Sequence, residues 1–181
     1  MPAGKTHDKI TWLCLSPVLA ASWFLSHDLK VCASAGLSFV FAGLMFSGDL
    51  DVKSVQYKRW GWFKWIWLPY QRLVSHRSPL SHGPVLGVLT RLLYVSLWFV
   101  LLFVLWSWLA QQLQQQDLLA QSLESVRSLS HWLKSQPMVL IGGLAGLWLG
   151  GLSHTLADEL GSHWKRFRRK KARKKQVRKS R

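Results

Sequence analysis

The chain has 181 residues, of which 49% belong to the hydrophobic set, 24 are Lys or Arg and only 8 are Asp or Glu. Twelve of the basic residues lie in the last 17 positions, so residues 1–164 carry a net charge of only +4. This pattern excludes a soluble nucleic-acid-binding domain, because the charge belongs to a tail and the rest of the chain contains long apolar runs. We expect one membrane-embedded domain over residues 1–164 and a basic tail over residues 165–181.

Four apolar segments approach or reach the roughly 17 to 25 residues that a helix needs to cross a bilayer. They cover about residues 11–25, 31–47, 92–110 and 138–157. The first contains Pro17, which we expect to break it. It also follows Lys5 and Lys9, as the apolar part of a signal peptide would, but a second apolar segment so close behind it favours a helical hairpin. The expected fold is therefore all-α, a four-span helical integral membrane protein.

The fourth apolar segment is rich in glycine at helical spacing. Small residues at such intervals let a second helix approach closely. We therefore expect this helix to be the most enclosed of the four. The glycines are Gly142, Gly143, Gly146, Gly150 and Gly151.

Lys and Arg collect before the first span, between the second and third spans, and after the fourth. The segment between the third and fourth spans, residues 111–136, has one Arg and one Lys balanced by one Asp and one Glu. Because positive charge favours the cytoplasmic side, the basic segments and both termini are predicted to be cytoplasmic. Residues 111–136 then lie outside, where the spacing of their leucines predicts an amphipathic helix.

Two further segments are expected at the membrane surface. Residues 60–70 contain four Trp, one Phe and one Tyr, and such residues favour the headgroup level, which predicts an interfacial aromatic segment. This segment serves either as an anchor or as a lip that binds acyl chains. The tail contains no acid, so we expect it to be disordered or to continue the fourth span as a helix, and to contact anionic lipid headgroups. Nucleic acid is a less favoured partner because the tail lacks interleaved aromatics.

Ionisable residues near hydrocarbon are costly and are usually paired or functional. Four clusters of them fall where the predicted helices end on the cytoplasmic side. His154 and Asp158 are four apart and share one face of a helix. Asp49 and Asp51 are two apart and point the same way in an extended or turn segment, where one of them can instead orient a ligand histidine. The predicted metal ligands are His7, Asp49, Asp51, His76, His82, His154 and Asp158.

Mixed His and carboxylate ligands indicate a divalent metal, first Zn²⁺, with Mn²⁺ or Fe²⁺ as alternatives. The set exceeds what one tetrahedral ion needs, so one ion and two ions both remain open. Each motif alone also fits a helix cap or a solvated loop, and Arg77 could pair with Asp49 or Asp51 in a structural ion-pair network. Joint placement on one membrane face favours the metal. His27, His131 and His163 lie outside the clusters.

Three motifs follow the early histidine and carry a family resemblance. They are Gly48-Asp-Leu-Asp-Val-Lys-Ser54, His76-Arg-Ser-Pro-Leu-Ser-His82 and Gly151-Leu-Ser-His-Thr-Leu-Ala-Asp158. They resemble the PDxD-like, HRGxTHS-like and SHxxxD-like elements of the membrane-bound metal-dependent hydrolases, also described as LexA-binding and inner membrane-associated. Over about residues 4–160 the chain is even more similar to a bacterial group described as uncharacterised metal-binding proteins. The resemblance implies a metal-site role for all seven predicted ligands and a place in the bacterial inner membrane.

The same resemblance implies a hydrolase. Helical zinc-dependent phospholipases C, a more distant similarity, also use an His-x-x-x-Asp pair, which implies a phosphoester or lipid-like substrate. Arg77, the predicted catalytic residue, or Lys53 would neutralise the phosphate. The alternative is a non-catalytic metal-binding membrane protein whose tail docks on lipid or RNA. The turn differs from the family, because Gly48 replaces a Pro and Ser78-Pro79-Leu80 replaces a Gly-containing turn.

Overall fold

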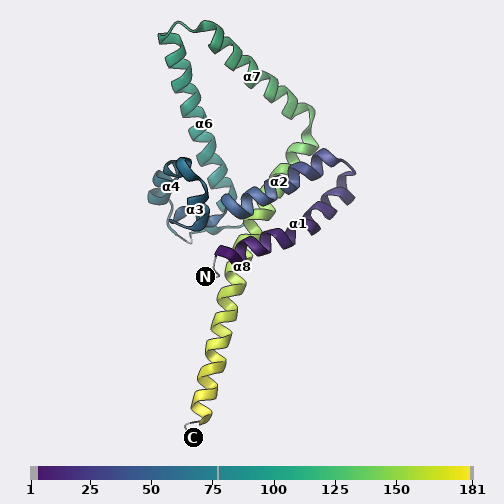
Figure 1. The fold of residues 1–181 in the computed structure, drawn as a ribbon, viewed down its shortest axis with the longest axis vertical. Helices are drawn as coiled ribbons and strands as arrows, with labels where there is room; N and C mark the ends of the chain where they lie inside the picture. Colours follow the sequence, from purple (N-terminus) through teal and green to yellow (C-terminus); the bar gives the residue numbers. More distant parts are fainter. Residues whose placement is uncertain (1–3, 77, 180–181) are drawn as a thin grey trace.

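The computed structural model describes residues 4–76 and 78–179, which are almost entirely helical and contain no strand. The all-α prediction is confirmed. Figure 1 shows the helices in chain order from the N-terminus in purple to the C-terminus in yellow. The elements are α1 (Gly4–Ser26), α2 (Leu29–Met45), the 3₁₀ helix η1 (Gly48–Asp51), α3 (Val55–Arg59), the 3₁₀ helix η2 (Gly61–Ile66), α4 (Trp67–Leu73), α5 (Pro79–His82), α6 (Leu86–Gln112), α7 (Gln116–Ser135) and α8 (Pro137–Lys179).

Among the described residues, four helical segments are long and apolar enough to cross a membrane, at the places predicted. The segments are Thr6–Ser26, Leu29–Asp51, Leu86–Gln112 and Pro137–Ser162. The predicted break at Pro17 is wrong, because α1 is continuous through it. Proline removes one backbone hydrogen bond, and the packing of α1 along α2 holds the helix on both sides of the gap.

The fourth predicted span is the first part of a much longer helix, α8, which continues through Lys179. Lys, Arg, Ala and Gln are good helix formers, and the tail has no proline to stop the helix. Of the two conformations expected for the tail, its described backbone has the helical one. The division into a domain over residues 1–164 and a tail over residues 165–181 stays a prediction.

The pair α2 and α8 forms the most extensive helix contact in the molecule. Its closeness comes from glycines spaced by four along α8, which meet backbone spaced by four along α2. A Cβ atom at Gly146 would lie 2.1 Å from the carbonyl oxygen of Ala35, and one at Gly150 would lie 2.5 Å from that of Phe39. The Ser34 hydroxyl also donates to the Val139 carbonyl at 2.8 Å. The close approach at these glycines is as predicted. The expectation that the fourth span is the most enclosed of the four is wrong, because 44% of the second span is buried against 22% of the fourth.

An aromatic core lies beneath η1. Leu50, Trp67 and Tyr70 are almost completely buried in it, together with Phe46 and Tyr57. The predicted interfacial segment therefore has two parts with different roles. Its first part, η2, exposes Trp62, Phe63 and Trp65, whereas its second part, α4, supplies core residues. The spacing of three between Trp67 and Tyr70 turns both side chains inward, away from any lipid. The interfacial position of the segment stays a prediction.

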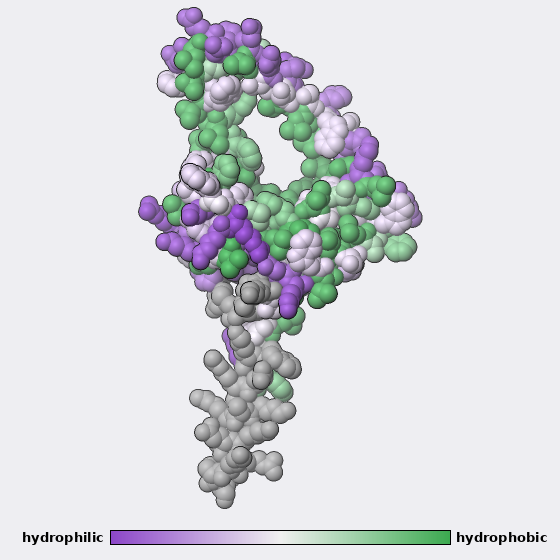
Figure 2. Space-filling view, viewed as in Figure 1, coloured by the Kyte–Doolittle hydropathy of each residue, from purple (hydrophilic) through white to green (hydrophobic). Residues whose placement is uncertain are grey.

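The helices α6 and α7 form an arm that departs from the packed helices, as Figure 1 shows in teal and green. Figure 2 shows an opening between α6 and α7, with hydrophobic side chains on both sides of it. The Trp106 indole donates to the Ser122 hydroxyl at 3.0 Å and joins the two helices. The predicted amphipathic helix over residues 111–136 is present as α7.

Candidate metal centre

The seven predicted ligands, which five different segments supply, meet in one place. His7 lies in the first turns of α1, Asp49 and Asp51 in η1, and His154 and Asp158 on α8. His76 precedes α5, and His82 ends it. Within the described residues they form three groups whose nitrogen or oxygen atoms lie within 4.8 Å of one another. The predicted catalytic residue, Arg77, lies outside the described residues.

The first group contains His7, His154 and Asp158. His7 Nε2 lies 3.3 Å from Asp158 Oδ1, and His154 Nε2 lies 3.6 Å from Asp158 Oδ2. The two imidazole rings are in contact, with their centroids 4.2 Å apart and their planes tilted by 34°. Both histidines are buried. One turn after His7, Thr11 packs directly on Gly43 of α2, where a Cβ atom would lie 2.5 Å from the Thr11 hydroxyl oxygen, so α1 approaches α2 closely beside the site. This group is the more enclosed end of the cluster.

The second group contains Asp51, His76 and His82. Asp51 Oδ1 lies 2.9 Å from His76 Nδ1, and Asp51 Oδ2 lies 3.6 Å from His82 Nδ1. The first distance is that of a hydrogen bond, so Asp51 orients the His76 ring. His76 is exposed, whereas the Asp51 carboxylate is fully buried. This group therefore lies at the open end of the cluster.

Asp49 links the two ends. Its Oδ2 lies 3.4 Å from His154 Nε2, and its Oδ1 lies 3.5 Å from His82 Nε2. The third group, which contains Asp49, His82 and Asp158, shares His82 with the second group and Asp158 with the first. A carboxylate can bridge two metals, so this continuous arrangement offers room for two neighbouring ions.

The distances fit a metal better than direct hydrogen bonding. Apart from the bond to His76, the His to Asp distances run from 3.3 to 3.6 Å, longer than a good N–H···O bond. Ligand atoms about 2.0 to 2.2 Å from one tetrahedral Zn²⁺ would lie roughly 3.3 to 3.6 Å apart. The corresponding atoms are also buried without hydrogen-bond partners among the described residues. They include Asp49 Oδ1, Asp51 Oδ2, His82 Nε2, His154 Nε2 and both carboxylate oxygens of Asp158.

The charges point the same way. Three carboxylates lie within one cluster, and their histidine neighbours are neutral in the form that binds metals. Like charges this close repel each other, and a buried carboxylate without a partner is costly. A divalent cation would satisfy the unpaired atoms and offset the repulsion. The residues present therefore fit a metal, and His7, Asp49, Asp51, His76, His82, His154 and Asp158 are the residues that would hold it.

Leu50 explains why η1 presents both of its aspartates to the site. Its side chain is completely buried in the aromatic core, and the flanking Asp49 and Asp51 lie on the other side of the 3₁₀ turn. Of the two conformations expected for the Asp-Leu-Asp segment, extended or turn, the structure has the turn. Because η1 is helical, Asp49 and Asp51 diverge, and each one serves a different group of the cluster.

Two buried residues that support the site were not expected from the sequence. The side-chain amide of Gln56 lies 3.1 Å from His154 Nδ1, the ring nitrogen opposite the one that faces the carboxylates. Metal binding through Nε2 requires the tautomer in which Nδ1–H donates to the amide oxygen of Gln56. Arg91 donates from Nη1 to the Ser81 carbonyl at 2.7 Å, directly before His82. An arginine inside an apolar span is the signal that could have identified Arg91. Nothing in the sequence marks Gln56, because it begins a short helix in a polar linker.

Tyr70 and Arg91 are close enough to influence each other and Asp51 electrostatically. Burial raises the pKa of the Tyr70 hydroxyl above its ordinary value. Tyr70 therefore stays neutral at physiological pH and does not compete with Asp51 for the positive charge of Arg91.

Gly48 gives a physical reason for one departure from the hydrolase pattern. The His82 ring packs on it, and a Cβ atom at position 48 would lie 3.1 Å from His82 Cδ2. A side chain there would move the ring by a few tenths of an ångström. The glycine and the altered turn before His82 are thus parts of one local arrangement.

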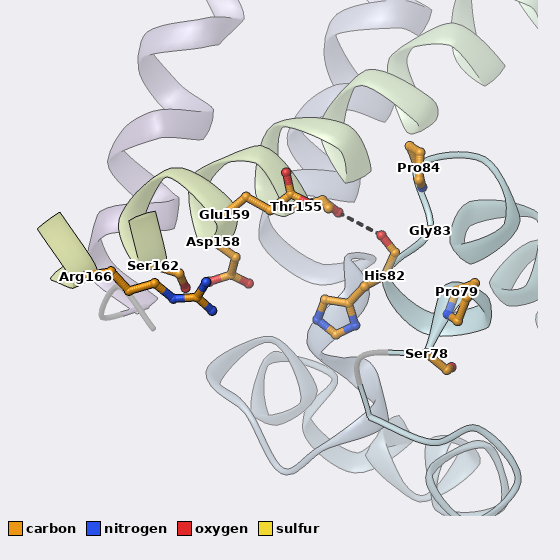
Figure 3. Close-up of a pocket in the computed structure, with 10 residues that line it drawn as sticks. All are labelled: Ser78, Pro79, His82, Gly83, Pro84, Thr155, Asp158, Glu159, Ser162 and Arg166. Carbon is orange, nitrogen blue, oxygen red and sulfur yellow. Dashed lines mark hydrogen bonds between the residues drawn. The ribbon is translucent and has the colours of Figure 1, made fainter. Parts of the chain in front are cut away.

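A cavity of about 610 Å³ opens beside the cluster, and Figure 3 shows the side chains that line it. His82 and Asp158 form its inner wall, so two of the candidate ligands face open space. Thr155 and Ser162 lie on α8 at the same cavity, and Arg166 faces Asp158 across it. Lys53, which was expected to be available for a phosphate, is exposed and does not line this cavity.

The family model described as Uncharacterized metal-binding protein (DUF2227) matches residues 2–168. The chain belongs to this family. The match includes every segment that contributes to the cluster, and it confirms the resemblance to the uncharacterised metal-binding group. It supports metal binding and carries no activity, so it does not extend to the hydrolase family. No curated protein and no solved structure matches this chain.

Proposed function

We propose that this chain is a membrane-bound, metal-dependent hydrolase whose centre lies at the cytoplasmic face of a bacterial inner membrane. The proposed metal is Zn²⁺, as one or two ions, and the proposed substrate is a phosphoester or lipid-like molecule. The observation that supports hydrolysis best is the cavity against His82 and Asp158. A structural metal site is closed by its protein ligands, whereas a catalytic site keeps a side open to substrate.

The residues divide the work of such a site between them. His7 and His154 are buried and would anchor metal at the closed end, while His82 and Asp158 would present it to the cavity. A divalent metal held there supplies Lewis acidity and lowers the pKa of water. Asp51 orients His76, which would hold metal at the open end of the cluster. Gln56 and Arg91 keep the two ends of the cluster in place.

A second function, metal binding without catalysis, is favoured by a different observation. Both histidines of the first group are buried, and their rings are in contact. An ion held there by His7, His154 and Asp158 would join α1 to α8 and stabilise the packed helices. The two functions can be separated by experiment, because a hydrolase needs an open cavity for its substrate and a structural metal site does not.

Metal analysis of the purified full chain, followed by a broad esterase and phosphodiesterase screen, tests the choice. A hydrolase should turn over at least one ester in a metal-dependent manner, and a bulky substitution in the cavity wall, Thr155→Trp, should lower turnover without lowering metal content. A structural centre should retain metal, show no turnover and tolerate Thr155→Trp. Loss of thermal stability on chelation is expected in both cases, so it serves as a control for metal loading.

The proposed orientation places both termini in the cytoplasm and α7 outside, with the tail at anionic lipid headgroups. The support is the distribution of Lys and Arg and the presence of four candidate spans. Reporter fusions after Lys9 and after Arg181 should read as cytoplasmic, and one at Gln121 should read as external. An external carboxyl terminus would contradict this arrangement.

A further inference from the structure

The face of α8 that carries two candidate ligands continues outward past the cluster. Residues four apart lie above one another on a helix, and His154, Asp158, Ser162 and Arg166 follow this spacing. Three of the four, Asp158, Ser162 and Arg166, line the cavity. In Figure 3 the guanidinium of Arg166 points back toward the Asp158 carboxylate along this helix face. The helix thus places a cation at the outer end of a cavity that has metal ligands at its inner end.

Arg166 is free to bind a ligand. No hydrogen bond or ion pair of Arg166 is formed with the other described residues, although Asp158 and Glu159 line the same cavity. The hydroxyl of Thr155 is already engaged by the Gly151 carbonyl at 3.2 Å, whereas Ser162 has no such partner among the described side chains. A guanidinium and a free hydroxyl therefore project into one space. An arginine fork suits an anion with several oxygens, such as a phosphate.

Binding of an anion in this cavity depends on bound metal, because carboxylates outnumber guanidinium groups along the cavity wall. Without metal, the cavity has the carboxylates of Asp158 and Glu159 against one guanidinium, and an anion is repelled. A metal ion held by His82 and Asp158 would offset the carboxylates at the inner wall and would offer a ligand position to a phosphate oxygen. The cavity would then have a metal at its inner end, the Arg166 guanidinium at its outer end and a hydroxyl between them, an arrangement complementary to a phosphate group.

We propose that Arg166 and Ser162 form the anion-binding arm of the centre and bind the phosphate of a phosphomonoester or phosphodiester placed between them and the metal ligands. The proposal rests on metal binding in the proposed function, narrows the proposed substrate to a phosphate ester and adds the residues that bind its phosphate. It also assigns Arg166, the second residue of the predicted lipid-binding tail, to the site instead. The phosphate can belong to a lipid headgroup or to a soluble ester, since the chemistry recognised is the same.

Equilibrium dialysis of radiolabelled inorganic phosphate against the Zn²⁺-loaded full chain in detergent tests this directly. Arg166→Gln should weaken phosphate binding about tenfold or more, the effect of losing one charge-assisted hydrogen bond, with metal content unchanged. Arg166→Lys should recover part of the affinity, and the metal-free chain should not bind phosphate. Arg72→Gln removes the same charge from an exposed position outside the cavity and should leave the affinity unchanged.

The outcomes separate this proposal from the hydrolase proposal. Equal phosphate affinity in Arg166→Gln and the unaltered chain would overturn the anion-binding arm, whatever the ester screen shows. Loss of metal in Arg166→Gln would overturn it too, since Arg166 would then belong to the metal shell. Absence of turnover on every ester would defeat the hydrolase and leave phosphate binding by Arg166 standing.

Competition identifies the source of the phosphate. Short-chain phosphatidic acid and glycerol phosphate carry the same phosphomonoester, and both should displace labelled phosphate from the loaded chain. Stronger displacement by phosphatidic acid points to a lipid headgroup, and equal displacement points to a soluble ester. Failure of both to displace phosphate would contradict ester recognition at this site.

Discussion

The packed helices and the α6–α7 arm use similar apolar sequences in different ways. In α2, side chains such as Ala35, Phe39 and Ala42 are buried against its neighbours. In α6, side chains such as Leu97 and Phe99 are more than half exposed along an equally apolar helix. The difference follows from glycine. The glycines of α8 recur every four residues where α8 meets α2, whereas α6 has no glycine after Gly87. Hydrophobicity makes both segments candidate spans, but small residues decide which helices pack.

The location of the polar residues follows from the same difference. Every described candidate ligand lies on or beside the closely packed helices, and none lies on α7 or the upper part of α6. A metal centre needs side chains held within a few tenths of an ångström, and close backbone packing provides that rigidity. Substitutions in the packed helices should therefore affect the centre strongly, and matched substitutions in the arm should not.

The largest effect is expected from Gly146→Leu. A Cβ atom there already lies 2.1 Å from the Ala35 carbonyl oxygen, so leucine must separate α8 from α2 and move His154 and Asp158 from the other ligands. We expect loss of nearly all bound metal and a destabilisation of at least about 3 kcal/mol. Thermal unfolding and metal analysis in detergent measure both. Ser96→Leu in α6, at an exposed position, should change neither, and a similar loss there would remove the distinction between the regions.

Single ligands come next. His82→Ala and His154→Ala each remove an atom that faces Asp49 at 3.5 or 3.4 Å, and each should abolish most metal binding while the helices stay assembled. His131→Ala on α7 provides the matched control, because that side chain is exposed in the arm. Metal content measured after dialysis against a weak chelator reports the effect. If all three variants retained equal metal, the proposed centre would be wrong.

Replacement of the buried Arg91 is expected to have a smaller effect, on the free energy of unfolding. Arg91 is buried, donates to the Ser81 carbonyl and lies 5.7 Å from the centre of the Phe46 ring. Arg91→Met should lower the free energy of unfolding by about 2 to 3 kcal/mol, because a charged hydrogen bond is lost and a buried carbonyl is left unpaired. Arg127→Met in α7 removes an exposed ion pair with Glu124 and should cost less than about 1 kcal/mol. Equal changes in thermal stability would contradict the comparison.

Apolar length and charge distribution were enough to predict the fold class and the four candidate spans, because both depend on composition within one segment. The same reasoning predicted that seven candidate metal ligands lie close together, and the structure brings them together, since helix ends on one side of a bundle lie near one another. It left open whether the segment of Asp49 and Asp51 is extended or forms a turn, and the structure has a 3₁₀ turn there. That turn depends on the burial of Leu50 in a core supplied by Trp67 and Tyr70, which are distant in sequence.

The helical tail shows a second limit of sequence reasoning. Charge density separated residues 165–181 from the domain, yet the periodicity of α8 runs across that boundary and brings Arg166 to the cavity of Asp158. Composition averages over a segment, whereas a helix face selects every third or fourth residue. For the same reason Gln56 escaped notice, because its role depends on one contact with His154 over 98 positions of sequence.

The smallest predicted effect concerns that contact. Gln56 is buried and is held by Ser47 and the Gly43 carbonyl while it touches His154 Nδ1. Gln56→Leu keeps the approximate volume but frees the His154 ring, so metal affinity should fall about 10- to 100-fold, the usual effect of losing a partner that orients a ligand. Competition with a chelator of known affinity measures the change, and Gln121→Leu on exposed α7 is the matched control. Unchanged affinity in Gln56→Leu would mean that α8 alone fixes the ring. The rigidity of the centre would then come from the glycine packing of α2 and α8 without help from the linker.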